Sequence, residues 1–357
     1  MPETVLTPAQ QIAKDLSSMQ SDISSLQSGV QLSGLRNDLD KVESKTAGLT
    51  ERIIAIRIRG YIFERNLETE AADIPGRWHP LNATIQAQIN AQAHVLQGLM
   101  RSIEAQMTRL SAIASNPPAA LPLVNQLKTD IDNLESKVSA IERSIRGMFD
   151  DFSNEVEKID KRLGQVEWML TQVDEACFKL MPVEAAIMAV KTVWAKDGKD
   201  SKTNPEGVLF LTDQRLIFEQ KQEVATKKFL FITTETQKVQ ACLFDIPVQM
   251  IEKIESSKQG LFKNEDWLDL LFATGAQLRE AKLHLYEQDC AVWQGYLNKA
   301  VAKEFDKERV APVASEVVDK IKNAPTICPS CGGSISKPVL RGMDSISCEF
   351  CGHVIRL

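Results

Sequence analysis

Apolar side chains recur at alternating steps of four and three through the first 180 residues. The first such seam comprises Ile12, Leu16, Met19, Ile23, Leu26 and Val30. Similar seams run from Leu32 to Ile56, from Ile85 to Leu110, and from Leu127 through Phe152 to Val173. Heptad spacing of this kind is typical of long helices that pack along a narrow apolar stripe. The pattern therefore predicts a helical coiled-coil region over residues 1–180.

Helix-breaking residues divide this region. Gly29 and Gly34 lie between the first two seams, and prolines lie in 73–80 and 116–122. Because proline and glycine rarely continue a helix, we expect breaks near 29–34, 73–80 and 116–122, with Trp78 filling the junction at the second. From about Leu123 to Phe178 we expect one rod, in which an extra step of four after Phe152 relaxes the supercoil without ending the helix.

An exposed apolar stripe must pack against another helix. Loops at 73–80 and 116–122 would fold the helices back on one another as antiparallel hairpins within one chain. A homo-oligomeric coiled coil would cover the same stripe with a second chain. The pattern does not decide between these two arrangements, and they can coexist.

The apolar period changes after Pro182. Short β-prone segments follow one another and end in a segment, Asp289–Phe305, whose apolar residues recur at helical spacing. The expected strands are 187–194, two within 207–219 joined by a turn at Thr212–Gln214, 229–232, 239–244, 248–255, 267–273 and 282–286. This succession predicts a curled sheet or small barrel over 181–305, with a helix covering its open end.

One hairpin in this region carries a family resemblance. The segment Gly207-x-Leu209-x-Leu211-Thr212-Asp213-x-Arg215-Leu216-Ile217-Phe218 resembles the hairpin of GRAM and bacterial PH-like domains. The resemblance covers about residues 180–305 and implies a PH-like β-barrel capped by a C-terminal helix. It also implies a module that binds phosphoinositides, binds proteins, or serves as structure alone.

Lysines cluster in two of the expected loops. They are Lys191, Lys196, Lys199 and Lys202 in and before the first loop, and Lys227 and Lys228 at a later turn. Lysines on paired loops could bind an anionic lipid headgroup at a membrane surface. Asp197 and Asp200 are interleaved with them, so a protein partner is the alternative at this site.

Four cysteines near the C-terminus have the spacing of a metal site. Cys328 and Cys331 form one C-x2-C pair, and Cys348 and Cys351 form another after sixteen intervening residues. Four thiolates complete a tetrahedron around one structural Zn²⁺ and leave no position for an activated water. The segment 326–357 resembles a zinc ribbon, which a linker at 306–325 joins to the β domain. His353 is expected to take no part.

Composition and missing motifs argue against several classes of function. The net charge of −6 over 357 residues argues against broad nucleic-acid binding, which needs a basic surface. Neither a secretory signal nor an apolar stretch long enough to span a membrane is visible, so we expect a cytoplasmic location. Known catalytic motifs are also missing, so we expect no enzyme.

These observations predict a multidomain α+β protein that acts as a non-enzymatic scaffold or adaptor. It would fold or self-associate through its coiled coils, and it would dock a protein or membrane partner through the PH-like domain and the ribbon. A nucleic-acid-associated regulator acting through the ribbon and an anionic-lipid-binding recruitment protein are the alternatives.

Overall fold

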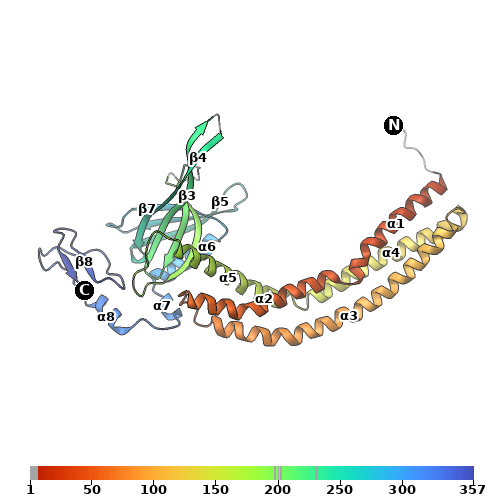
Figure 1. Ribbon diagram of the computed structural model, residues 1–357, viewed down its shortest axis with the longest axis horizontal. Coiled ribbons are helices and arrows are strands. Elements are labelled where there is room, and N and C mark those ends of the chain that lie inside the picture. The colour runs from red at the N-terminus through yellow and green to blue at the C-terminus, as the bar shows by residue number, and fades with distance from the viewer. Residues whose placement is uncertain (1–6, 197, 200, 202, 230–231) are drawn as a thin grey trace. The chain divides into compact units, whose positions relative to one another are not determined.

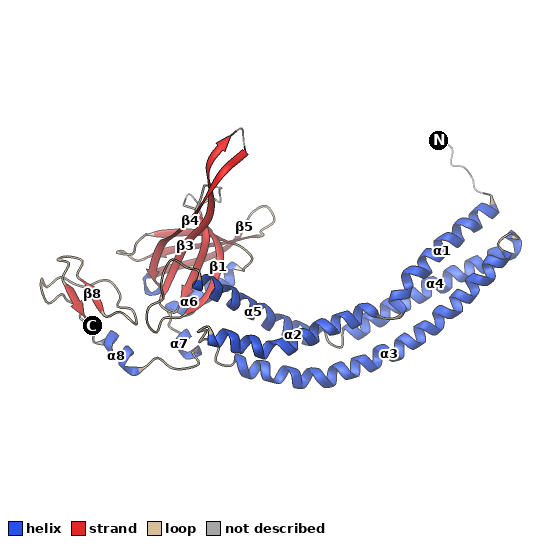
Figure 2. Cartoon of the chain, in the orientation of Figure 1, coloured by secondary structure: helices blue, strands red, loops and turns tan. Residues whose placement is uncertain are grey.

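The computed structural model describes residues 7–357 except 197, 200, 202, 230 and 231, and for 224–236 it describes no side chains. The chain divides into two compact units. Unit 1 comprises Met1–Thr50 and Thr69–Asp160, and unit 2 comprises Glu51–Glu68 and Lys161–Leu357. The described strands all belong to unit 2 (Figures 1 and 2). Among the described residues, no helix combines the length and the apolar content that crossing a bilayer requires.

Five long helices come first in the chain. They are α1 (Pro8–Val30), α2 (Ser33–Ile58), α3 (Leu67–Ile113), α4 (Pro117–Arg146) and α5 (Asp150–Asp174). The first begins at Thr7, whose hydroxyl accepts a hydrogen bond from the Gln10 amide at 3.3 Å, while the Gln10 side chain accepts from the Thr7 amide at 2.9 Å. This reciprocal pair is a capping box, which satisfies amide groups that a helix N-terminus leaves free.

Ion pairs and hydrogen bonds in unit 1 define the helix directions. Asp15 of α1 pairs with Lys128 of α4 at 2.8 Å, and Asp38 of α2 pairs with Arg146 of α4 at 2.7 Å, so α1–α2 runs parallel to α4. The long α3 leads the chain back from the end of α2 to the start of α4 and is antiparallel to both. Most seam residues are buried, among them Met19, Leu26, Val30, Leu127 and Leu134, whereas Leu99 and Met148 are exposed. The stripes are thus covered within one chain, as the intramolecular alternative predicts, and self-association stays a prediction.

The predicted break at 73–80 is wrong, because α3 passes through Pro75, Gly76 and Pro80. Ala71, Ile74 and Trp78 are buried at helical spacing, whereas both prolines are exposed. Burial of this continuous face outweighs the hydrogen bonds that proline removes. The chain turns earlier, after α2, where Gly60 has φ of +94°. In unit 2, Phe63 from this turn packs its ring 5.6 Å from that of Phe305.

The other breaks differ in extent. The break at 29–34 is present as a turn at Gln31–Leu32, where Leu32 is buried with φ of +53°. The break at 116–122 is confined to 114–116, since Pro117 and Pro118 begin α4, where a missing amide proton costs nothing. The expected rod from Leu123 to Phe178 is two helices, separated by a turn at 147–149.

Trp78 fills the interior of the helical unit rather than a junction. Its ring stacks on Phe152 with centroids 5.1 Å apart, and its indole N–H donates to Glu43. We expect Trp78→Ala to lower the free energy of unfolding by about 3–5 kcal/mol, because the lost ring leaves a cavity. Chemical denaturation followed by far-UV circular dichroism measures this change. His79→Ala is the control, because His79 is exposed; equal effects of the two substitutions would contradict the prediction.

Unit 2 is built on one antiparallel sheet of seven strands. The strands are β1 (Ala186–Trp194), β2 (Glu206–Thr212), β3 (Arg215–Phe229), β4 (Ile232–Pro247), β5 (Ile251–Gln259), β6 (Glu265–Phe272) and β7 (Glu280–Leu285). Their order is β4-β3-β2-β1-β7-β6-β5. Because β4 and β5 are not paired with each other, the sheet is open, whereas the sequence analysis expected a barrel. Of the strand expected at 229–232, Phe229 ends β3 and Ile232 begins β4, while 230 and 231 lie outside the described residues. The strand expected at 239–244 is part of β4.

A helix packs against the β5 edge of this sheet. It is α6 (Cys290–Val301), shorter than the expected 289–305, and it buries Cys290, Trp293, Leu297 and Ala300. The Gln294 side chain donates to the carbonyl of Ile254 at 2.8 Å and fixes the helix to β5. The chain continues through α7 (Phe305–Glu308), α8 (Ser315–Lys322), β8 (Ser345–Ser347) and β9 (Val354–Arg356). Strands β8 and β9 pair with each other and belong to the cysteine-rich segment.

Candidate metal centre and its contact with the sheet

The four cysteines of the C-terminal segment lie together. All four sulfur atoms are within 4.8 Å of one another. Cys328 Sγ is 3.7 Å from Cys351 Sγ, and Cys331 Sγ is 3.6 Å from Cys348 Sγ. Four sulfurs about 2.3 Å from a tetrahedral zinc ion would be about 3.8 Å apart. The arrangement is therefore compatible with a four-sulfur metal site.

Two matching turns present the sulfurs. The amide of Gly332 donates to the Cys328 carbonyl at 2.9 Å, and the amide of Gly352 donates to the Cys348 carbonyl at 3.0 Å. Both glycines follow the second cysteine of a pair and have positive φ, +73° and +72°. Side chains with a Cβ rarely adopt this conformation. Each C-x2-C-G segment thus forms a tight knuckle that turns both thiols to one point.

Neighbouring groups shift the pKa values of two of the four thiols in opposite directions. Backbone N–H groups of Cys351 and Phe350 lower the pKa of Cys348 to about 7. The Gly333 N–H lowers the pKa of Cys331, but hydrogen bonds with the Cys351 and Cys348 thiols outweigh it and raise that pKa to about 12. Thiolates are the form that binds a metal, so metal binding would release the remaining protons.

Around the cysteines the apolar core is small. Its buried members are Cys328, Cys348, Ile346 and Ile355. Four partly exposed side chains pack against them, those of Ile335, Val339, Met343 and Leu357. His353 is exposed, and its carbonyl accepts from the Cys348 amide at 2.9 Å. Its imidazole is not part of the sulfur cluster in the described structure.

A charged contact that the sequence did not reveal joins the cysteine-rich segment to the sheet. Asp213, in the β2–β3 turn, is 7% exposed and accepts from Arg341 at 2.6 Å and also from Arg309. Arg341 pairs in addition with Asp306 at 2.6 Å. Burial raises the pKa of Asp213, and the two guanidinium groups oppose that rise. Two cations thus offset the cost of burying this carboxylate.

Backbone contacts reinforce the same junction. The Gln214 side chain donates to the carbonyl of Arg341 at 2.9 Å and accepts from the Arg341 amide. Gly342 has φ of +86°, and a Cβ at this position would lie 2.2 Å from the carbonyl oxygen of Pro182. The β2–β3 turn thus holds the cysteine-rich segment. No signal in the sequence indicated this, because the partners come from distant positions.

A second buried pair stands beside this junction. Arg215 forms two hydrogen bonds with the Glu184 carboxylate, at 2.9 and 2.7 Å, and also pairs with Asp245. The Thr212 hydroxyl donates to the same carboxylate at 2.7 Å. Burial disfavours the charged form of Arg215, but Glu184 and Asp245 outweigh it and raise the pKa of Arg215.

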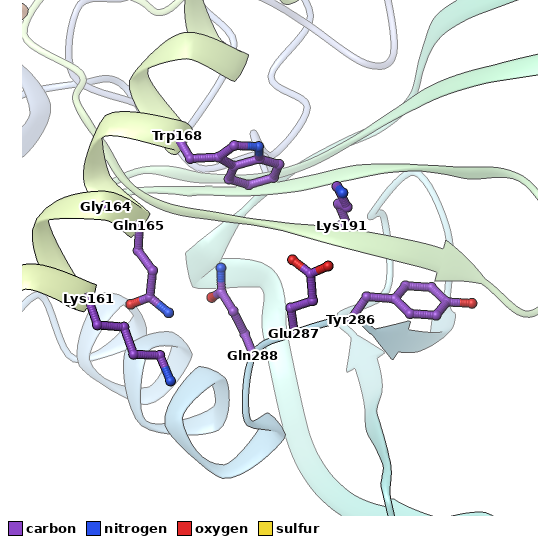
Figure 3. Close-up of a pocket in the computed structure, with 8 residues that line it drawn as sticks. All are labelled: Lys161, Gly164, Gln165, Trp168, Lys191, Tyr286, Glu287 and Gln288. Carbon is purple, nitrogen blue, oxygen red and sulfur yellow. The ribbon is translucent and has the colours of Figure 1, made fainter. Parts of the chain in front are cut away.

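The candidate lysines whose side chains the structure describes, Lys191, Lys196 and Lys199, do not form one cluster. Lys196 and Lys199 are exposed on the β1–β2 loop, and the Lys196 ammonium lies 4.8 Å from the centroid of the Trp194 ring. Lys191 instead lines a cavity beside α5 (Figure 3). Lys202 lies outside the described residues.

The remaining pair, Lys227 and Lys228, lies on the extension of β3 past its pairing with β2. That pairing ends at Gln220, seven residues before Lys227. This is about 23 Å of strand at about 3.3 Å per residue. The side chains of both lysines lie outside the described structure.

Comparisons with known proteins give weak matches. No protein-family model matches the chain, and no curated protein matches it. The N-terminal PH domain of Vps36 is 15% identical, with 35% of this chain and 85% of that chain covered, at a TM-score of 0.22. The DH/PH domains of PDZ-RhoGEF, solved in a complex with activated RhoA, are 12% identical, with 83% and 93% covered, at a TM-score of 0.23. At such scores these similarities carry no argument, and the chain is not assigned to a family.

Proposed function

We propose that this protein is a non-enzymatic adaptor whose PH-like sheet domain and zinc-bound ribbon act as one docking module for a protein partner. The observation that carries the proposal is the double pairing of buried Asp213 with Arg341 of the ribbon and Arg309 of the linker. Two buried charge pairs and the Gln214 contacts hold the ribbon against the β2–β3 turn. A partner would therefore meet a continuous surface made of both parts.

Zinc is the metal that best suits the four cysteines. Soft thiolate ligands in a tetrahedral set select Zn²⁺ or an iron–sulfur centre. The two glycine-closed knuckles are typical of structural zinc sites, in which all four positions belong to protein sulfurs. The ion would supply folding energy and hold β8 and β9 in place, and such a closed ligand set leaves no coordination position for a substrate.

The lipid-binding and nucleic-acid-binding alternatives are weaker. A basic surface on the ribbon would need Arg341, but its side chain is only 11% exposed and pairs with Asp213 and Asp306. Lys337 lies near Glu349, at 3.7 Å. For anionic lipid, Lys196 and Lys199 are the described lysines that share one loop. Two lysines attract an anionic membrane with only about 2 kcal/mol.

Quantitative affinity purification of the full chain tests the proposal. We expect partners captured by the wild type to be lost with Arg341→Ala, because the ribbon leaves the sheet, and kept with Arg356→Ala, an exposed arginine of the same ribbon. Partners that survive Arg341→Ala unchanged would contradict a joint docking surface. Flotation with anionic vesicles that Lys196→Glu with Lys199→Glu abolishes would instead favour membrane recruitment.

A further inference from the structure

A cavity lies between α5 and the sheet of unit 2. One face of α5 lines it at helical spacing with Lys161, Gln165 and Trp168, and β1 contributes Lys191 from the opposite side (Figure 3). The segment Tyr286–Gln288, which links β7 to α6, completes the lining. The volume is about 370 Å³, within the range of small-molecule sites.

Part of this lining is held in place. The Gln288 side chain donates to the carbonyl of Ala189 at 2.8 Å and accepts from the Trp293 indole at 2.7 Å. The Tyr286 amide donates to the carbonyl of Lys191 at 3.0 Å. Between them Glu287 has φ of +63°, a left-handed conformation that is costly for a side chain with a Cβ. Strain of this kind concentrates at functional sites, where the surrounding structure maintains it.

The cavity combines unpaired cations with an aromatic face. Within the described part of the chain, neither Lys161 nor Lys191 has a carboxylate partner, so with Glu287 the lining carries a net positive charge. Trp168 is half-buried and projects from α5 over the cavity (Figure 3). The carboxamide of Gln165 offers a donor and an acceptor that no described residue uses.

We propose that this cavity binds a mononucleotide. A base can stack on the indole of Trp168, and a glutamine carboxamide such as that of Gln165 can pair with the edge of a base. A carboxylate placed as Glu287 accepts hydrogen bonds from ribose hydroxyls. The two lysine ammonium groups attract the phosphate. This site lies on α5, β1 and the β7–α6 segment, whereas the docking surface proposed above lies at the β2–β3 turn and the ribbon.

Isothermal titration calorimetry of the full-length protein tests the site. The probes are the four ribonucleoside 5′-monophosphates. Adenosine, which lacks the phosphate, and inorganic phosphate, which lacks the base and the ribose, serve as reference probes. We expect at least one monophosphate to bind more tightly than adenosine or phosphate alone. Trp168→Ala should weaken that binding by about 5- to 150-fold, which corresponds to base–aromatic stacking of about 1–3 kcal/mol.

Matched variants identify each contribution. Lys161→Gln with Lys191→Gln should make the monophosphate bind no better than the nucleoside, whereas Lys253→Gln, at a lysine that lines another cavity, should change nothing. Trp168→Phe keeps an aromatic ring and should retain binding, whereas Trp168→Leu keeps apolar bulk without a ring and should weaken binding, which tests stacking even where the alanine variant misfolds. Absence of binding by all four monophosphates would overturn the proposal. Binding that stays as tight as in the wild type in Trp168→Leu and in the double lysine variant would also overturn it.

Discussion

Removal of the proposed zinc ion is expected to unfold residues 326–357 and to leave the seven-stranded sheet folded. The apolar core of this segment has few buried members, Ile346 and Ile355 beside the cysteines. Zinc ligation contributes about 10–16 kcal/mol to folding in small zinc peptides, far more than two isoleucines at about 1.5–3 kcal/mol each. The sheet has its own buried core, with Phe210, Phe218, Phe244 and Phe272, and should persist.

Trypsin sensitivity at Arg341 measures this unfolding. In the folded protein its side chain is 11% exposed and pairs with Asp213, so cleavage should be slow. After chelation, or in a Cys348→Ser variant, cleavage after Arg341 should become rapid, because the segment no longer holds the arginine against the turn. Elemental analysis should find one zinc ion per chain in the untreated protein.

Cys242→Ser is the matched control for the cysteine substitution, because Cys242 is exposed and lies outside the sulfur cluster. This variant should keep its zinc and its protease resistance. Protein that contains no metal and still protects Arg341 would show that the four cysteines are not a structural metal site.

Loss of the Arg215 side chain is expected to destabilise unit 2 by about 3–5 kcal/mol, the usual cost of breaking a buried ion pair. In Arg215→Met the Glu184 carboxylate, whose side chain is 0% exposed, would be left in the interior without its cation. Urea unfolding followed by tryptophan fluorescence gives the change in free energy.

Two further variants separate the charge effect from packing. Arg215→Met combined with Glu184→Gln should recover a large part of the loss, because no fully buried carboxylate is left without a cation and the amide oxygen can still accept from Thr212. Asp245 also loses its cation, but its side chain is 34% exposed. Lys253→Met removes an ion pair in which both side chains are more than half exposed, 60% for Lys253 and 59% for Glu255. Such a pair contributes about 0–1 kcal/mol. If Arg215→Met costs no more than Lys253→Met, the buried pair does not stabilise the sheet.

Burial explains which helix predictions succeeded. The heptad spacing predicted the seams of α1 and α4, where Leu26 and Leu127 are buried. It would also have predicted α3 through 73–80, since Ala71, Ile74 and Trp78 keep the helical period. In this segment the apolar period outweighs the prolines. Their cost is small because Pro75 and Pro80 lie on the exposed face, where water can satisfy the carbonyl groups that lose partners.

Short-range patterns in the sequence determined the helices, most of the strands and the gathering of four cysteines. Each of these depends on spacing over a few residues, such as the two-residue gap and the glycine of each knuckle. Tertiary structure alone decided that the sheet is open, that Lys191 is separated from Lys196, and that Arg341 pairs with Asp213 across 128 positions. Strand order and the partners of buried charges depend on which distant segments share the interior. Residues so far apart leave no periodic trace in the chain.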